Sequence, residues 1–230
     1  DRNGKVCQLT ICNTAEFTRG LAEPLHERGQ LLFANSTPNR FPWLAAWLDI
    51  MGTETNWSPG EDYRPMSMAD LAYRRALCYQ RPYLFLMNTL YDEFKPEWVD
   101  LYFKRAIAFG HFPSFFSHNA ADDPYWQRPA LYNRDRPLFQ KYIPVCATIS
   151  RAGWEPVTHA RAAQDDVHVE RFGPAEDGAV YLTVFNDGDE ACAAVVSVDI
   201  ETLGVGDCEE LLPDRPAPIE RPLLGSWSVP

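Results

Sequence analysis

Up to about residue 155, apolar residues occur in two alternating patterns: short unbroken runs and longer stretches with helical spacing. An unbroken apolar run between turn residues predicts a buried strand, and apolar positions repeated every three or four residues predict an amphipathic helix. Strands are therefore expected at residues 31–35, 49–53, 83–87 and 111–116. Helices are expected at residues 14–28, 43–48, 67–79, 97–109 and 137–152.

Local start signals support several of these helices. Asn13 with Glu16, and Ser67 with Asp70, have the spacing of a capping box, in which two side chains satisfy free amides at a helix start. Pro96 and Pro137 are placed at first helical positions of the helices expected near residues 97–109 and 137–152, where the missing N–H of proline costs no hydrogen bond. The apolar stripe of the first helix, which is expected to face the core, consists of Phe17, Leu21 and Leu25.

The predicted strands are apolar throughout, which is typical of strands buried on both faces of a parallel sheet. Strands that alternate with helices predict an α/β fold in which helices cover such a sheet. Near residue 155 the pattern changes to alternating polar and apolar positions, which predicts antiparallel strands at 167–172, 179–186, 193–199, 209–212 and 223–229. Two units are expected, an α/β unit of residues 1–155 and a small β unit of residues 156–230.

Composition narrows the range of partners. The formal net charge is −11, which argues against a nucleic acid or an anionic membrane surface, because phosphate binding needs clustered Lys and Arg. No apolar run approaches the roughly 20 residues of a membrane helix. The five histidines are not spaced with Cys or Asp as metal ligands would be, and no phosphate-binding loop is present, so no metal or cofactor is expected. The sequence does not indicate a compartment.

The order of the strand ends carries a family resemblance. Residues 35–38 (NSTP) end one predicted strand, residues 51–57 (MGTETNW) end the next, and Asn88-Thr89 and residues 112–116 (FPSFF) follow. A strand of residues 182–186 (LTVFN) stands behind them. This order resembles the C-terminal half of bacterial glycoside-hydrolase-like proteins, which have a TIM barrel followed by a β-sandwich.

The resemblance implies a (β/α) barrel of which this chain holds about four units. A whole barrel takes about 250 residues, so the four strands here correspond to strands five to eight. A carboxylate on strand four, which often serves in such barrels, would then precede Asp1. Half a barrel leaves an unpaired strand edge on each side, so a second chain or a dimer mate is expected to complete it.

Carboxylates at strand ends are the candidate catalytic groups, because barrel enzymes carry their chemistry at the carboxyl ends of the strands. Glu54 directly follows the predicted strand 49–53 and is expected to act as general acid or base on a glycosidic oxygen, the acid role requiring burial. Asp92 follows the next strand and is the candidate second carboxylate. Each has a structural alternative, since Glu54 can pair with an arginine and Asp92 can cap a helix. Asp49 is expected at the opposite, stabilising end of its strand.

Four further side chains at strand ends suit sugar recognition. Trp57 offers an aromatic face for a sugar ring, and amide and imidazole groups match hydroxyls as donors and acceptors. The candidate binding residues are Asn35, Trp57, Asn88 and His118. Their alternative role is to satisfy loop backbone.

Three functions are compatible with these features. The first is hydrolysis of an O-glycosidic bond by a carboxylate pair, with part of the site supplied from outside this chain. The second is non-catalytic carbohydrate binding or a structural remnant of such an enzyme. The third is another (β/α) enzyme, such as an isomerase or lyase, because fold does not determine function.

Overall fold

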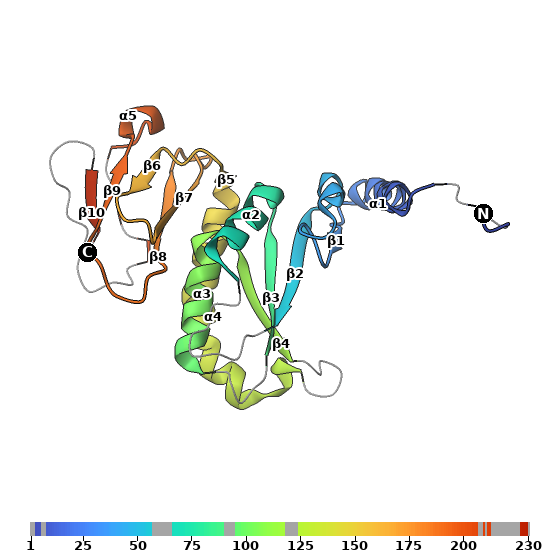
Figure 1. Ribbon diagram of the computed structural model, residues 1–230, viewed down its shortest axis with the longest axis horizontal. Coiled ribbons are helices and arrows are strands. Elements are labelled where there is room, and N and C mark those ends of the chain that lie inside the picture. The colour runs from blue at the N-terminus through green and yellow to red at the C-terminus, as the bar shows by residue number, and fades with distance from the viewer. Residues whose placement is uncertain are drawn as a thin grey trace.

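A computed structural model of the chain describes residues 3–5, 8–56, 66–89, 95–117, 124–206, 209, 211–212 and 226–229. The elements form successive layers: a parallel sheet, a layer of helices, and two small antiparallel sheets (Figure 1). The N-terminal helix lies at one end of the molecule and the antiparallel sheets lie at the other.

The first unit alternates strands and helices as predicted. Its elements are α1 (Thr10–His26), β1 (Phe33–Ala34), the 3-10 helix η1 (Pro42–Ala46), β2 (Ile50–Asn56), α2 (Met68–Cys78), β3 (Tyr83–Thr89), α3 (Pro96–Ala108), β4 (Phe112–Ser117), the 3-10 helix η3 (Tyr125–Gln127) and α4 (Pro129–Ala152). The four strands pair in the order β1-β2-β3-β4, all parallel, which confirms the predicted α/β unit with a parallel sheet.

One face of this sheet packs against the helices. Tyr83, Phe85 and Met87 alternate along β3 and are almost completely buried. The Tyr102 ring of α3 contacts both Phe85 and Phe115, with ring centroids 5.2 and 5.1 Å apart. Its hydroxyl donates to the Phe85 carbonyl, so that the helix is fixed to the sheet by a polar contact inside an aromatic core.

Two helix starts differ from the prediction. α1 begins at Thr10, so Asn13 lies inside the helix and the expected capping box does not form. The N-cap is Leu9, which makes no side-chain cap. α4 begins at Pro129 and contains Pro137 in its interior. The Ser67 cap is confirmed, because its hydroxyl accepts from the Asp70 amide at 3.1 Å.

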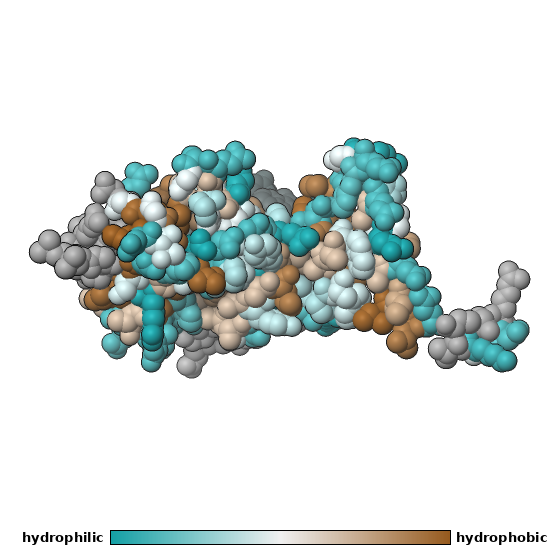
Figure 2. All heavy atoms as spheres, turned by 90° about the horizontal axis from the view of Figure 1, so that it is seen from above, coloured by the Kyte–Doolittle hydropathy of each residue, from teal (hydrophilic) through white to brown (hydrophobic). Residues whose placement is uncertain are grey.

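The expected apolar stripe of α1 is also wrong. Phe17 and Leu21 are 70% and 39% exposed, whereas Thr18 and Ala22 of the same helix are buried. Apolar side chains remain visible on the surface toward this end of the molecule (Figure 2). α1 is instead attached through its last residue, His26, whose Nε2 lies 2.8 Å from the Asp49 carboxylate.

The second unit contains two antiparallel sheets. Its elements are β5 (Trp154–Glu155), β6 (Ala160–Ala162), β7 (Val167–Phe172), β8 (Tyr181–Asn186), β9 (Ala194–Val198), α5 (Ile200–Leu203) and β10 (Ser226–Val229). One sheet has the order β5-β7-β8 and the other β10-β9-β6. The predicted strand at 209–212 is wrong, since the described residues among these lie outside any strand. The two sheets share a small core that includes Ala162, Val167 and Val196.

The β5-β7-β8 sheet packs on the far side of the helical layer. The Thr183 hydroxyl of β8 donates to the Ala108 carbonyl of α3 at 2.6 Å. The Phe172 ring leaves no room for a side chain at Gly110, because a Cβ there would lie 2.6 Å from it. The Arg105 side chain of α3 is 2% exposed and pairs with Asp187, which follows β8. It also donates to the Met66 carbonyl, which ties α3 to the segment before α2.

We predict that Asp187→Ala lowers the free energy of unfolding by about 3 kcal/mol, because it removes a partner of the buried Arg105 guanidinium. Glu176→Ala is the control, since this acidic side chain is exposed on the same unit, and its effect is expected within about 0.5 kcal/mol. Urea unfolding of both variants measures the difference. Equal stabilities would show that the Arg105–Asp187 pair contributes nothing.

A histidine is buried at the start of β4 without hydrogen bonds to its ring. His111 is fully buried against the Tyr83 ring, 4.5 Å between centroids, and within the described part of the chain neither ring nitrogen has a partner. Burial lowers the pKa of His111 well below its usual value, and the nearby Arg75 and Arg74 guanidiniums lower this pKa further. The same burial raises the pKa of the neighbouring Cys146 thiol to about 12 and that of Cys78 to about 11.

We predict that stability falls as the pH drops below the unfolded-state pKa of His111, about 6.5. Below this pH, His111 binds a proton in the unfolded chain but stays neutral in the native protein. The free energy of unfolding therefore falls by about 2 kcal/mol between pH 6.5 and pH 5. His111→Phe should remove this part of the pH dependence, whereas His168→Gln, at a half-buried position, should retain it. Thermal unfolding across this pH range measures it, and identical slopes in wild type and His111→Phe would contradict it.

Candidate functional site

The carboxyl ends of the four parallel strands lie at one edge of the sheet. Because the strands pair in parallel, Ala34, Asn56, Thr89 and Ser117 end at this edge. Among the described residues of β1–β4, Glu54 is the one acidic residue. It lies within β2, two residues before the end of the strand, opposite Leu86 of β3.

Glu54 projects from the sheet face that faces away from the helices. Side chains alternate between the faces of a strand, and the neighbouring Thr53 is buried on the helical side. Glu54 is exposed, and the apolar residues that share its face, among them Leu84, Leu86 and Phe112, are only partly buried. α2, α3 and α4 gather on the other side of the sheet (Figure 1). Among the described residues, Glu54 therefore lies on a largely apolar and partly exposed face of the sheet.

Asn35 binds the Glu54 carboxylate. Its Nδ2 donates to Glu54 Oε1 at 2.6 Å, which links the residue after β1 to β2. The other end of the Asn35 amide is fixed, because Oδ1 accepts the Ser36 backbone N–H at 2.7 Å. A backbone N–H can only donate, so the oxygen must face Ser36 and the nitrogen must face Glu54.

The loop that carries Asn35 is hydrogen-bonded to β2. The Thr37 N–H donates to the Gly52 carbonyl at 3.0 Å, and the Thr53 hydroxyl donates to the Thr37 carbonyl at 3.0 Å. Within the loop, the Thr37 hydroxyl donates to the Ala34 carbonyl at 2.6 Å. Gly52 is required by close packing, since a Cβ there would lie 2.9 Å from the Leu84 carbonyl oxygen. These contacts hold the loop against β2, next to Glu54.

The structure brings two predicted site residues into contact, Asn35 and Glu54. Asn88 lies on the same face of the sheet as Glu54, two residues beyond Leu86 toward the carboxyl end of β3. Trp57, Asp92 and His118 lie outside the described residues. The burial that a general-acid role for Glu54 required is absent, because its side chain is exposed.

Asp49 is a structural residue at the other end of β2. Its Oδ2 accepts from the Leu32 backbone N–H at 2.7 Å and lies 2.8 Å from His26 Nε2. Partial burial opposes its ionisation, but the hydrogen bonds from Leu32 and His26 prevail and lower the pKa of Asp49. The carboxylate thus ties α1 and the segment before β1 to the start of β2.

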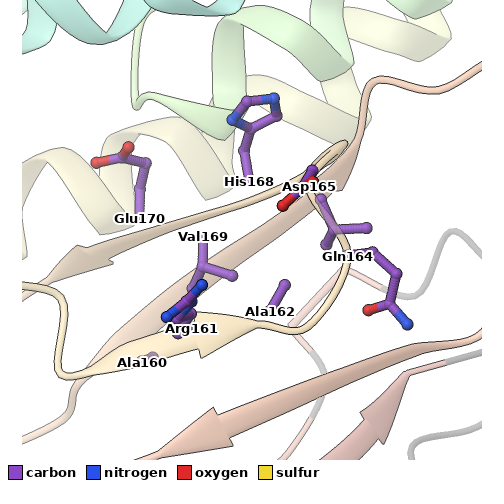
Figure 3. Close-up of a pocket in the computed structure, with 9 residues that line it drawn as sticks. Ala160, Arg161, Ala162, Gln164, Asp165, His168, Val169 and Glu170 are labelled. Carbon is purple, nitrogen blue, oxygen red and sulfur yellow. The ribbon is translucent and has the colours of Figure 1, made fainter.

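A polar pocket that no sequence pattern indicated lies in the second unit. It lies along β6, β7 and the segment that connects them, and its lining includes Arg161, His168 and Glu170. His168 and Glu170 project from one side of β7 and Val169 from the other (Figure 3). Burial raises the pKa of Glu170, which accepts from Trp154 Nε1 at 2.5 Å. This pocket is lined by residues of β6, β7 and their connection, across the helical layer from β2 (Figure 1).

The described residues contain neither a metal-binding cluster nor a membrane-spanning helix. No group of three His, Cys, Asp or Glu side chains there is arranged to hold a metal ion. No helix in the same part of the chain has both the length and the apolar character needed to cross a membrane.

Comparison of the chain with protein-family models, with curated proteins and with solved structures found no match in any of the three.

Proposed function

We propose that the parallel sheet is half of a (β/α) barrel and that the two antiparallel sheets are the β-sandwich that follows it. The strand order β1-β2-β3-β4 advances in one direction without reversal. Right-handed crossovers that advance one way place every helix on the same face. Open doubly wound sheets cover both faces because their strand order reverses. A sheet wound in one direction buries its second face by closing on further strands.

The covering strands are proposed to come from a second chain or a dimer mate. A two-fold axis along the strands would keep all of them parallel and set β4 of one copy beside β1 of the other. Both strands are at the ends of the described sheet. The partly buried Leu84, Leu86 and Phe112 would then become core.

For the function, we propose hydrolysis of an O-glycosidic bond in a carbohydrate, with Glu54 as a catalytic carboxylate. The supporting observation is the Asn35–Glu54 pair at the carboxyl ends of β1 and β2, on the face that barrel closure would enclose. Barrel enzymes bind and transform substrates at that end. Hydrolysis of this kind needs two carboxylates and no cofactor. Asp92 is proposed as the second, with Trp57, Asn88 and His118 as sugar-binding residues.

Non-catalytic carbohydrate binding is the alternative, and one observation favours it. The Glu54 carboxylate is exposed and already accepts a hydrogen bond from Asn35. An amide and a carboxylate that face solvent together can bind sugar hydroxyls without any proton transfer.

We predict that Glu54→Gln lowers kcat for aryl glycoside hydrolysis by at least about 10²-fold, the usual contribution of a general acid or base. Glu201→Gln on α5 is the control and should leave turnover unchanged, because this exposed carboxylate lies in the second unit. Release of the aryl group measures both. Unchanged turnover in Glu54→Gln would exclude the catalytic role. Retained sugar affinity without turnover in the wild type would favour the binding module.

A second prediction concerns barrel completion. In a purified sample, the partner available to complete the barrel is a second copy of the chain. Sedimentation should therefore give a mass of twice 26.2 kDa. Phe112→Asp places a charge on the open sheet face and should return the mass to that of one chain. Val157→Asp, at an exposed position of the second unit, is the control and should not change the mass. A monomer of the wild-type chain at all concentrations would contradict closure by a dimer mate.

A further inference from the structure

We propose that Asn35 is a positioning residue that holds Oε1 of Glu54, so that Glu54 reacts through Oε2 as a base. The inference rests on the proposed hydrolysis and goes beyond it, because it assigns the reacting oxygen and its direction of proton transfer. The observation that carries it is the 2.6 Å hydrogen bond from Asn35 Nδ2 to Glu54 Oε1.

The direction of this hydrogen bond is set by the loop rather than by Glu54. Asn35 Oδ1 is occupied by the Ser36 N–H at 2.7 Å, so its NH₂ group has to face the carboxylate. An amide N–H is a donor only, and Oε1 must therefore accept. A proton on Oε1 would compete with the amide for the same oxygen, which leaves Oε2 as the atom able to take up a proton.

The loop also restricts where the amide can be. The Thr37 N–H and carbonyl are both hydrogen-bonded to β2, the strand on which Glu54 stands. Because Asn35 and Glu54 are tied to the same short stretch of strand, their relative position does not depend on the helices or on the second unit. Preorganised groups of this kind contribute to rate through geometry.

The base role agrees with the environment of Glu54. An amide N–H that donates to Oε1 interacts more strongly with the charged carboxylate of a base than with the neutral carboxyl group of an acid. In the proposed step, Oε2 takes a proton from water while the water oxygen bonds to the anomeric carbon. The glycosidic C–O bond breaks, and the leaving oxygen takes a proton from the second carboxylic acid.

The first arm of the test does not require activity. The Asn35 side-chain amide protons are followed by NMR in the wild type and in Glu54→Ala. With the carboxylate removed, one of them should move upfield and exchange with water about fivefold faster, as expected for one lost hydrogen bond. Asn39→Ala is the control, since Asn39 lies in the same loop and accepts from Thr53 rather than binding Glu54. Unchanged Asn35 resonances in Glu54→Ala would overturn the inference.

The second arm measures kinetics on aryl glycosides. Asn35→Ala should lower kcat by about 10²-fold through misplacement of Glu54, with KM within about twofold of wild type. Asn35→Asp should move the pH profile of kcat toward higher pH, because two adjacent carboxylates share a proton. Asn39→Ala should leave kcat, KM and the profile unchanged. Wild-type kcat and pH profile in Asn35→Ala would overturn the positioning role. If the wild type hydrolyses no glycoside while the Asn35 amide resonances still change in Glu54→Ala, the proposed function is refuted instead.

Discussion

A parallel sheet buried by helices has apolar residues on both faces, and the described helices of this chain cover one of them. Every crossover between β1 and β4 advances in the same direction, so the helices accumulate on a single side. The side chains toward the helices, such as Phe85 and Met87, are nearly inaccessible, whereas their neighbours Leu84 and Leu86 are half-exposed. The partial exposure of this second face and the position of Glu54 on it both follow from the one-sided cover by the described helices.

The helical layer is apolar on two sides because it lies between two sheets. In α3 the buried residues include Tyr102 toward the parallel sheet and Ala108 next to the antiparallel one, so the solvent-facing strip of this helix is narrow. Arg105 is buried in the same helix, and its charge is satisfied by Asp187 and by the Met66 carbonyl. A buried cation with partners in two other segments fixes how the second unit meets the first, since displacement would break its ion pair with Asp187.

Local signals in the sequence were sufficient for the central elements and insufficient at the periphery. β3, α2 and α3 were predicted because a continuous apolar run, the Ser67 cap and Pro96 each act within a few residues. The start of α4 was missed because Pro137 reads as a helix start, although the helix begins at Pro129 and tolerates it in the interior. Glu54 was predicted as a site residue because it lies at the end of a predicted strand. The hydrogen bond between Asn35 and Glu54 was not predicted, because this contact depends on how the hydrogen bonds of Thr37 hold the loop against β2.

The chemistry of the Asn35–Glu54 pair depends on what covers the open face. In water, an amide–carboxylate hydrogen bond competes with solvent and contributes little to the position of the carboxylate. Exclusion of water strengthens this hydrogen bond and increases its electrostatic effect on a nearby charge. Strands that closed the sheet would enclose the pair at the end of a barrel, where developing charge is stabilised most. Closure would thus supply the water-excluded environment that the exposed pair lacks, and the second carboxylate can act only if it reaches the same enclosed end. Any catalytic function of Glu54 is therefore expected to depend on completion of the sheet.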